Sequence, residues 1–154
     1  MEKYERELHP LPPFFPSGAR VLMLGSFPPK RERWKMDFFY PNFQNDMWRI
    51  FGLVFFEDAD YFLTVDRKLF REEAIREFLA AKGIALWDTA MEVKRLKGNA
   101  SDKFLEVLRP VDLPDVLAKL PCCKAIALTG QKATDTLLTL IEAGEPRVGG
   151  FTDT

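Results

Sequence analysis

Apolar residues in this chain gather in short continuous runs that are separated by segments with amphipathic spacing. Three of these runs, within 19–26, 84–87 and 124–128, predict strands buried on both faces, because only a covered strand lacks alternating polar positions. Apolar spacing and helix-start signals predict the helices, which we expect over 45–55, 71–82, 114–120 and 131–142. This alternation of strands and helices favours an α/β fold built on a parallel sheet.

The segments between these elements carry turn and capping signals. Gly83 is suited to end the helix before it, and Asp112 is suited to cap the helix after it. Residues 9–18 contain four prolines, so we expect this segment to be irregular or extended and to wrap the domain. His9 is the only histidine, and we expect it at the surface rather than in a catalytic triad.

Length, composition and charge limit the possible classes of protein. The 154 residues, of which 47% are hydrophobic, fit one domain over 1–154. No apolar run approaches the roughly 20 residues needed to cross a bilayer, and the charged first residues do not resemble a signal peptide. We therefore expect a cytoplasmic protein with no membrane partner, and a monomer. The net charge of −1 argues against a protein that coats nucleic acid without specificity.

Cysteine and histidine usage argues against a metal centre. Cys122 and Cys123 are adjacent, and two thiolates are too few for an iron–sulfur cluster. The chain has no His/Cys cluster that would indicate zinc. We expect these cysteines to serve packing, and we expect no metal and no cofactor.

The segment after the first strand combines aromatic and basic side chains. Phe38, Phe39 and Tyr40 follow a basic stretch closely in sequence. That stretch contains Lys30, Arg31 and Arg33. Flat stacking faces beside phosphate-sized charges suit an unstacked nucleobase. For the basic stretch taken alone, a solvated loop is the simpler explanation.

Several polar residues stand where strands end or helices begin, which is where ligands bind in parallel α/β sheets. Asp88 directly follows a predicted strand, where it could orient water, accept a base N–H or cap the next segment. Asn45 suits a helix start, and Asn99 suits a turn. Lys132 lies in the turn 130–133, whose amides could hold an anion at a helix N-terminus. No dinucleotide or P-loop motif is present.

Four motifs in order resemble the uracil-DNA glycosylase superfamily. They are G-S-F-P-P at 25–29, F-F-Y-P-N-F-Q-N-D-M-W at 38–48, I-A-L-W-D-T at 84–89 and T-G-Q-K-A at 129–133. The resemblance covers roughly residues 19–143 and is greatest to the mismatch-specific uracil/thymine and hypoxanthine-DNA glycosylase branches. It implies a three-layer αβα sandwich around a four-stranded parallel sheet. It also implies cofactor-free hydrolysis of the N-glycosidic bond of a damaged base flipped out of DNA.

The resemblance assigns roles to individual positions. Gly25, Ser26 and Phe27 match the water-activating motif, and Tyr40, or alternatively Phe39, matches the aromatic residue that stacks on the base. Asn45 matches the Asn of the helix that follows. By the same resemblance Asp88 matches the end of the strand that reads the base edge, and Asn99 lies near the Asn that the hypoxanthine branch uses for catalysis.

The chain departs from the family pattern at two places. Phe27 stands where the family has Asn or Asp, and a phenylalanine ring cannot polarise water, so Asp88, Asn99 or backbone donors would have to take that role. The chain also ends before the family's second motif, often His-Pro-Ser, and so resembles a member that lacks its C-terminal motif.

The sequence therefore favours a DNA glycosylase of base-excision repair whose partner is DNA containing uracil or hypoxanthine. Two other classes stay open. One is a nucleic-acid or nucleotide binding domain of the same fold that has lost the catalyst. The other is an interaction protein whose aromatic loop forms an exposed hydrophobic patch.

Overall fold

The computed structural model describes residues 5–95 and 105–153, and its centre is a parallel sheet. Strands β2 (Val21–Gly25), β3 (Ile84–Asp88) and β6 (Ala125–Leu128) form it in the order β3-β2-β6. The first of the three predicted strands is therefore central. Gly25 pairs with Asp88 and Leu24 pairs with Leu128, so the carboxyl ends of all three strands reach the same edge of the sheet.

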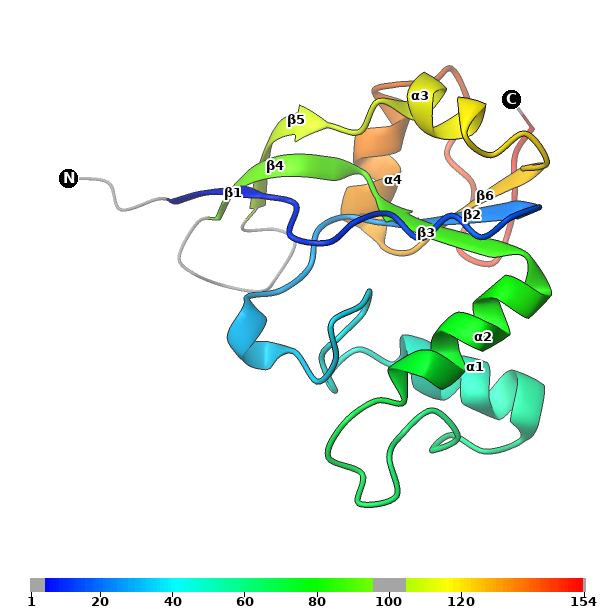
Figure 1. The fold of residues 1–154 in the computed structure, drawn as a ribbon. Coiled ribbons are helices and arrows are strands. Elements are labelled where there is room, and N and C mark those ends of the chain that lie inside the picture. Colours follow the sequence, from blue (N-terminus) through cyan, green and yellow to red (C-terminus); the bar gives the residue numbers. More distant parts are fainter. Residues whose placement is uncertain (1–4, 96–104, 154) are drawn as a thin grey trace.

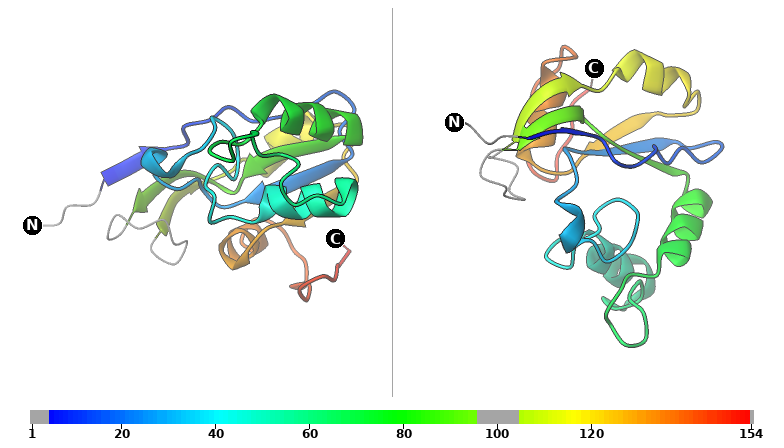
Figure 2. Two further views of the ribbon diagram at one scale, coloured as in Figure 1. Left: turned by 90° about the horizontal axis from the view of Figure 1, so that it is seen from below. Right: turned by 60° about the vertical axis from the view of Figure 1, so that its left-hand side comes forward.

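Helices cover both faces of this sheet. Helices α1 (Met47–Phe56) and α2 (Glu72–Lys82) lie on one side, and α3 (Leu113–Ala118) and α4 (Gln131–Leu138) lie on the other (Figure 1). The right-hand view in Figure 2 shows the same arrangement. The three-layer α/β sandwich is confirmed, with three rather than four parallel strands within the described residues.

Local signals account for the helix boundaries. Gly83 ends α2 in the left-handed conformation with φ of 73°, as its position predicts. The Asp112 side chain accepts a hydrogen bond from the Asp115 amide and caps α3. Helix α4 ends at Leu138, earlier than its apolar spacing predicts. None of the described helices is long and apolar enough to cross a membrane.

A second, antiparallel sheet extends the molecule beyond the carboxyl end of β3. It consists of β1 (Glu5–Leu8), β4 (Ala90–Arg95) and β5 (Leu105–Pro110) in the order β1-β4-β5. None of the three strands expected from the sequence covers 90–95 or 105–110, so the expected set of strands is incomplete. Strand β4 mixes apolar with polar residues because one of its faces packs on an apolar cluster and the other does not. Its average polarity therefore resembles that of a loop, and the strand is not recognisable from composition.

The proline-rich segment 9–18 is extended, as expected, and it lies along the outer edge of β3. Phe14 and Leu86 exchange backbone hydrogen bonds of 3.1 and 2.9 Å. The His9 amide donates to the Met91 carbonyl at 2.8 Å. The segment thus covers a strand edge that would otherwise expose unpaired backbone groups, and it carries His9 to the carboxyl end of the sheet.

Candidate functional site

A pocket of about 440 Å³ opens at the carboxyl edge of the parallel sheet. This is the edge at which ligands bind in open α/β sheets, and the volume lies within the range of small-molecule sites. The ends of β2, β3 and β6 and the loop before α1 form its walls. Its lining residues are Gly25, Ser26, Phe27, Pro28, Pro29, Phe39, Tyr40, Pro41, Asn42, Asn45, Met47, Asp88, Thr129 and Gly130.

Three oxygen atoms converge above Gly25. A methyl group built on Gly25 would lie 2.8 Å from Asp88 Oδ1, 3.1 Å from Tyr40 Oη and 3.3 Å from Thr129 Oγ1. These atoms belong to three different segments. The parallel register brings Asp88 and Thr129 to the end of β2, and the Tyr40 hydroxyl joins them from the loop before α1. Only glycine leaves room for all three, so the sequence motif has a direct steric reason.

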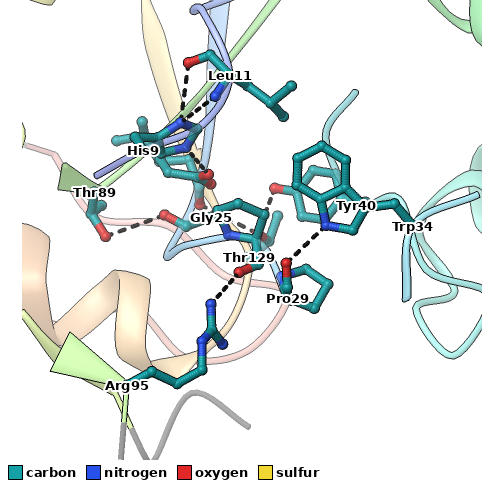
Figure 3. A network of polar contacts seen from close by, with 12 residues as sticks. His9, Leu11, Gly25, Pro29, Trp34, Tyr40, Thr89, Arg95 and Thr129 are labelled. Carbon is teal, nitrogen blue, oxygen red and sulfur yellow. Dashed lines mark hydrogen bonds and ion pairs between the residues drawn. The ribbon is translucent and has the colours of Figure 1, made fainter. Parts of the chain in front are cut away.

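Tyr40 holds a strained position in the wall of the pocket. Its φ of 51° lies in the left-handed region, which disfavours a side chain of this size. Two contacts stabilise it: the Trp48 indole N–H donates to the Phe39 and Tyr40 carbonyls, and Tyr40 Oη lies 2.7 Å from Thr129 Oγ1 (Figure 3). Strain maintained by surrounding contacts is typical of functional sites, and the ring of Tyr40 is only half-buried.

The other predicted base-binding residues contribute in different ways. Ser26 is buried at the pocket floor. Phe39 lies in the pocket wall but is only 3% exposed and packs in the main core, which leaves Tyr40 the better placed aromatic residue. Phe27 lines the pocket while its ring packs with Ala90 and the antiparallel sheet, so no polar group stands at its position.

The aromatic loop is not an exposed hydrophobic patch. Phe38 and Phe39 are buried, at 2% and 3% exposure, because they pack against Trp48 and the parallel sheet. Several exposed apolar side chains instead lie on α1, where Leu53 and Val54 face outward. The interaction protein inferred from this loop therefore loses its structural basis.

The prediction that His9 lies at the surface is wrong. Its imidazole is only 4% exposed and packs against the rings of Phe27, Phe39 and Trp87. His9 Nε2 lies 2.7 Å from Asp88 Oδ2 (Figure 3). The segment 9–18 was correctly predicted to wrap the domain, but a single sequence gives no sign of which part of the domain it covers.

The structure describes one of the two asparagines predicted to belong to the site. Asn45 lines the pocket, and its Oδ1 accepts a hydrogen bond from the Met47 amide at 2.8 Å, so it helps to begin α1. Within the part of the chain that the structure describes, no hydrogen bond uses its amide nitrogen Nδ2. Asn99 lies outside the described residues.

The predicted phosphate-binding residues lie beside the pocket. Arg31 and Arg33 are exposed in the short 3₁₀ helix η1 (Arg31–Arg33), which directly follows the pocket-lining Pro28 and Pro29. Arg31 also stacks on Trp34 at 4.3 Å and pairs with Asp37 at 3.3 Å, so part of its charge is compensated.

Lys30 and Lys132, which are also candidates for binding phosphate, have partly buried side chains. Lys30 is half-buried just before η1. Lys132 is half-buried in the first turn of α4, next to the pocket-lining Gly130.

Arg95 is a supporting residue that sequence reasoning missed. Its guanidinium donates to both carboxylate oxygens of Glu7, at 2.7 and 3.2 Å. It also donates to the Pro28 carbonyl at 3.0 Å, and Figure 3 shows Arg95 reaching toward this loop. It thus ties the antiparallel sheet to the loop that lines the pocket. No local pattern marks this role, because the three groups are far apart in sequence.

No group of three or more metal-ligating side chains is present among residues 5–95 and 105–153. Cys122 is exposed and Cys123 is half-buried, and both are free thiols. Cys123 packs against the main core, as expected, whereas Cys122 does not.

Comparisons with known proteins support the fold. No model of a protein family and no curated protein matches the chain. Among solved structures, the chain is similar to the solution NMR structure of a protein from Methanosarcina acetivorans that is described as a putative uracil DNA glycosylase. The TM-score is 0.60 and the identity 22%, over 84% of this chain and 73% of that one. At this identity the likeness shows a shared fold.

Proposed function

We propose that this chain is a DNA glycosylase that removes a deaminated base, uracil or hypoxanthine, after the base has rotated out of the duplex into the pocket. The observation that carries the proposal is the meeting of Asp88 Oδ1, Tyr40 Oη and Thr129 Oγ1 above Gly25. An acidic group, an aromatic ring and a basic loop around one pocket are the parts that such a reaction needs.

The proposed reaction is a hydrolysis. The oxygen of a water molecule bonds to C1′ of the deoxyribose, and the C1′–N bond breaks with its electron pair on the base. One proton of the water stays on the new C1′ hydroxyl, and the other ends on the departing base. The products are a free base and an abasic site, and no cofactor is consumed.

Each wall of the pocket takes a part in this reaction. The Asp88 carboxylate accepts a hydrogen bond from the attacking water and orients it, a role that Phe27 cannot take. The ring of Tyr40 stacks on the base, and the Asn45 amide donates to a base carbonyl. Orientation of the water and stabilisation of the departing anion are the main sources of rate in a site of this kind.

The test measures single-turnover release of the base from duplexes that carry one uracil or one deoxyinosine, read as strand cleavage at the abasic site. We expect Asp88→Asn to lower the rate by about 10²–10³-fold, the loss typical of one catalytic polar group. The matched control is Asp115→Asn, on the exposed side of α3. Equal rates for wild type and Asp88→Asn would contradict the assignment of Asp88.

A second variant pair tests the stacking role. Tyr40→Ala is expected to weaken binding of a duplex with an unpaired uracil by about 1–3 kcal/mol, whereas Tyr40→Phe keeps the ring and should bind within a few-fold of wild type. Fluorescence anisotropy with labelled duplex measures both. Equal binding by Tyr40→Ala and wild type would contradict the proposal that the pocket binds the base.

One observation favours a second candidate, a nucleic-acid binding domain without catalysis. Phe27 contributes a ring that packs into an apolar cluster, where a glycosylase of this fold needs a polar group for water. Tight binding of damaged duplex with no release of either base, in a protein whose variants fold normally, would favour this candidate.

A further inference from the structure

The only histidine of the chain is buried against the carboxylate at the pocket floor. The exposed fractions of the two side chains are 4% for His9 and 7% for Asp88, and Nε2 lies 2.7 Å from Oδ2. This distance is typical of a hydrogen bond strengthened by charge. His9 is not part of the pocket lining, so any effect on a ligand has to act through its neighbours, and of the pocket-lining residues that contact His9, Asp88 is hydrogen-bonded to it.

The other ring nitrogen of His9 determines which protons the ring carries. Nδ1 lies 3.2 Å from the Leu11 amide nitrogen, which donates to it, and 3.1 Å from the Leu11 carbonyl oxygen (Figure 3). A neutral ring that accepts from the Leu11 amide at Nδ1 carries its proton on Nε2. That proton points at Asp88 Oδ2, and the ring needs no rotation to donate it.

The Leu11 peptide also accommodates the charged ring. If Nδ1 gains a proton, the Leu11 carbonyl accepts it, and Nε2 continues to donate to Asp88. In either charge state the bond from Nε2 to Oδ2 is therefore kept. Packing against the rings of Phe27, Phe39 and Trp87 fixes the plane of the imidazole.

The consequence for Asp88 is a fixed division between its two oxygens. Oδ2 is occupied by His9, while Oδ1 lies over Gly25 beside the Tyr40 and Thr129 hydroxyls. A carboxylate with one oxygen bonded and the other aimed at a site cannot rotate its acceptor away from that site.

We infer that His9 is a positioning residue that holds Asp88 with Oδ1 facing the pocket, as an acceptor for the attacking water. The inference rests on the proposed function and deepens it. It predicts that loss of the His9 donor slows the chemical step much more than it weakens DNA binding, because His9 does not touch the ligand.

The first experiment does not depend on turnover. Because the chain has one histidine, labelling histidine with ¹⁵N gives imidazole NMR signals that belong to His9 alone. We expect the Nε2–H tautomer for the neutral ring, with an Nε2 proton protected from exchange with water. Asp88→Ala should remove that protection, and Asp115→Ala, on the exposed side of α3, should leave it unchanged. A ring with its proton on Nδ1, or protection that persists in Asp88→Ala, would overturn the inference.

The second experiment compares two replacements of His9. His9→Gln keeps a donor near the position of Nε2, whereas His9→Phe keeps a ring and removes the donor. We expect His9→Phe to lower the single-turnover rate on uracil duplex by 10- to 100-fold, with a dissociation constant within threefold of wild type. We expect His9→Gln to recover most of that rate.

The possible results separate this inference from the proposed function. A wild-type protein that releases no base contradicts the proposed function, and with it the catalytic part of the inference, while the NMR signals still decide whether His9 holds Asp88. Normal release by a folded His9→Phe protein overturns the inference and leaves the glycosylase proposal intact. If His9→Phe does not fold, a His9→Gln rate as low as that of Asp88→Asn overturns it, and a rate near wild type supports it.

Discussion

At the scale of single residues, the site depends most on Gly25, because a side chain at this position would collide with the groups around it. Its α-carbon lies beneath an acidic, a phenolic and a threonine oxygen, and a methyl group there would approach Asp88 Oδ1 to 2.8 Å. Contacts below about 3 Å between carbon and oxygen force one partner to move. Asp88 is held from behind by His9, so the carboxylate cannot retreat along its own axis.

We therefore predict that Gly25→Ala lowers single-turnover release of the base by about 100-fold, the loss that accompanies a displacement near 1 Å in a catalytic group. The matched control is Gly144→Ala, because a methyl group on Gly144 meets only Thr152 Oγ1, at 3.9 Å. Similar activity of Gly25→Ala and the control would mean that Asp88 Oδ1 does not take part in the chemistry.

Tyr40 illustrates how strain and function coincide at one residue. A left-handed backbone costs a residue with a side chain roughly 1–2 kcal/mol. The Trp48 indole and the Thr129 hydroxyl maintain the conformation from two sides, and the result is a half-exposed ring at the pocket wall. Phe39, one position earlier, has no positive φ, and its side chain packs in the main core.

At the scale of elements, the pocket needs both sheets. The parallel sheet supplies Gly25 and Asp88, but the loop after Gly25 is fixed by the antiparallel sheet through Arg95. The Arg95 side chain is 2% exposed. It forms an ion pair with Glu7 and donates a hydrogen bond to the Pro28 carbonyl. Removing one partner of a buried ion pair costs several kcal/mol, because the remaining group loses its compensation. The Glu7 side chain is 28% exposed and keeps some contact with water, so we expect a loss at the lower end of that range.

We predict that Arg95→Met lowers the free energy of unfolding by about 3 kcal/mol, as measured by urea denaturation. The control is Arg6→Met, on the adjacent strand. The Arg6 side chain is 76% exposed and lies 3.8 Å from Glu92, so its loss should cost less than about 1 kcal/mol. A loss for Arg95→Met as small as that of the control would show that the antiparallel sheet does not stabilise the pocket loop.

The elements that could be predicted from sequence are those with a local signature. Continuous apolar runs located β2, β3 and β6, and Gly83 and Asp112 located helix boundaries. The antiparallel sheet was missed because β4 and β5 mix polar with apolar positions, and this composition resembles that of a loop. Pairing between β1 and β4 joins residues nearly 90 positions apart, for which one sequence carries no signal.

The same distinction holds for the site. Gly25 and Asp88 stand at the ends of recognisable strands, so their place at the carboxyl edge of the sheet could be predicted, and Tyr40 lies in the loop that leads to a recognisable helix. The His9–Asp88 contact spans 79 residues and depends on the path of the proline-rich segment along β3. Local composition predicts that this segment is extended, but it does not predict the strand beside which the segment lies.

At the scale of the whole molecule, charge is balanced overall but uneven around the pocket. The net charge is −1, which gives no general attraction to DNA. The basic residues Lys30, Arg31 and Arg33 follow the pocket wall directly in sequence. Proteins release one condensed counterion for nearly each phosphate that they neutralise, so the dependence of binding on salt counts these contacts.

A triple variant, Lys30→Ala, Arg31→Ala and Arg33→Ala, should therefore reduce the slope of log K against log salt by about 2–3, since each phosphate contact contributes close to 0.9.

The matched control replaces Arg20, Lys119 and Lys124. Arg20 and Lys124 stand directly before β2 and β6 and so lie at the sheet edge opposite the pocket, and all three are exposed. Both triple variants change the net charge equally, so a general electrostatic effect would flatten both slopes alike. A change confined to the first variant would locate the DNA backbone beside the pocket, with the flipped base within reach of Tyr40 and Asp88. Equal slopes for the first variant and wild type would instead make the basic stretch a solvated loop.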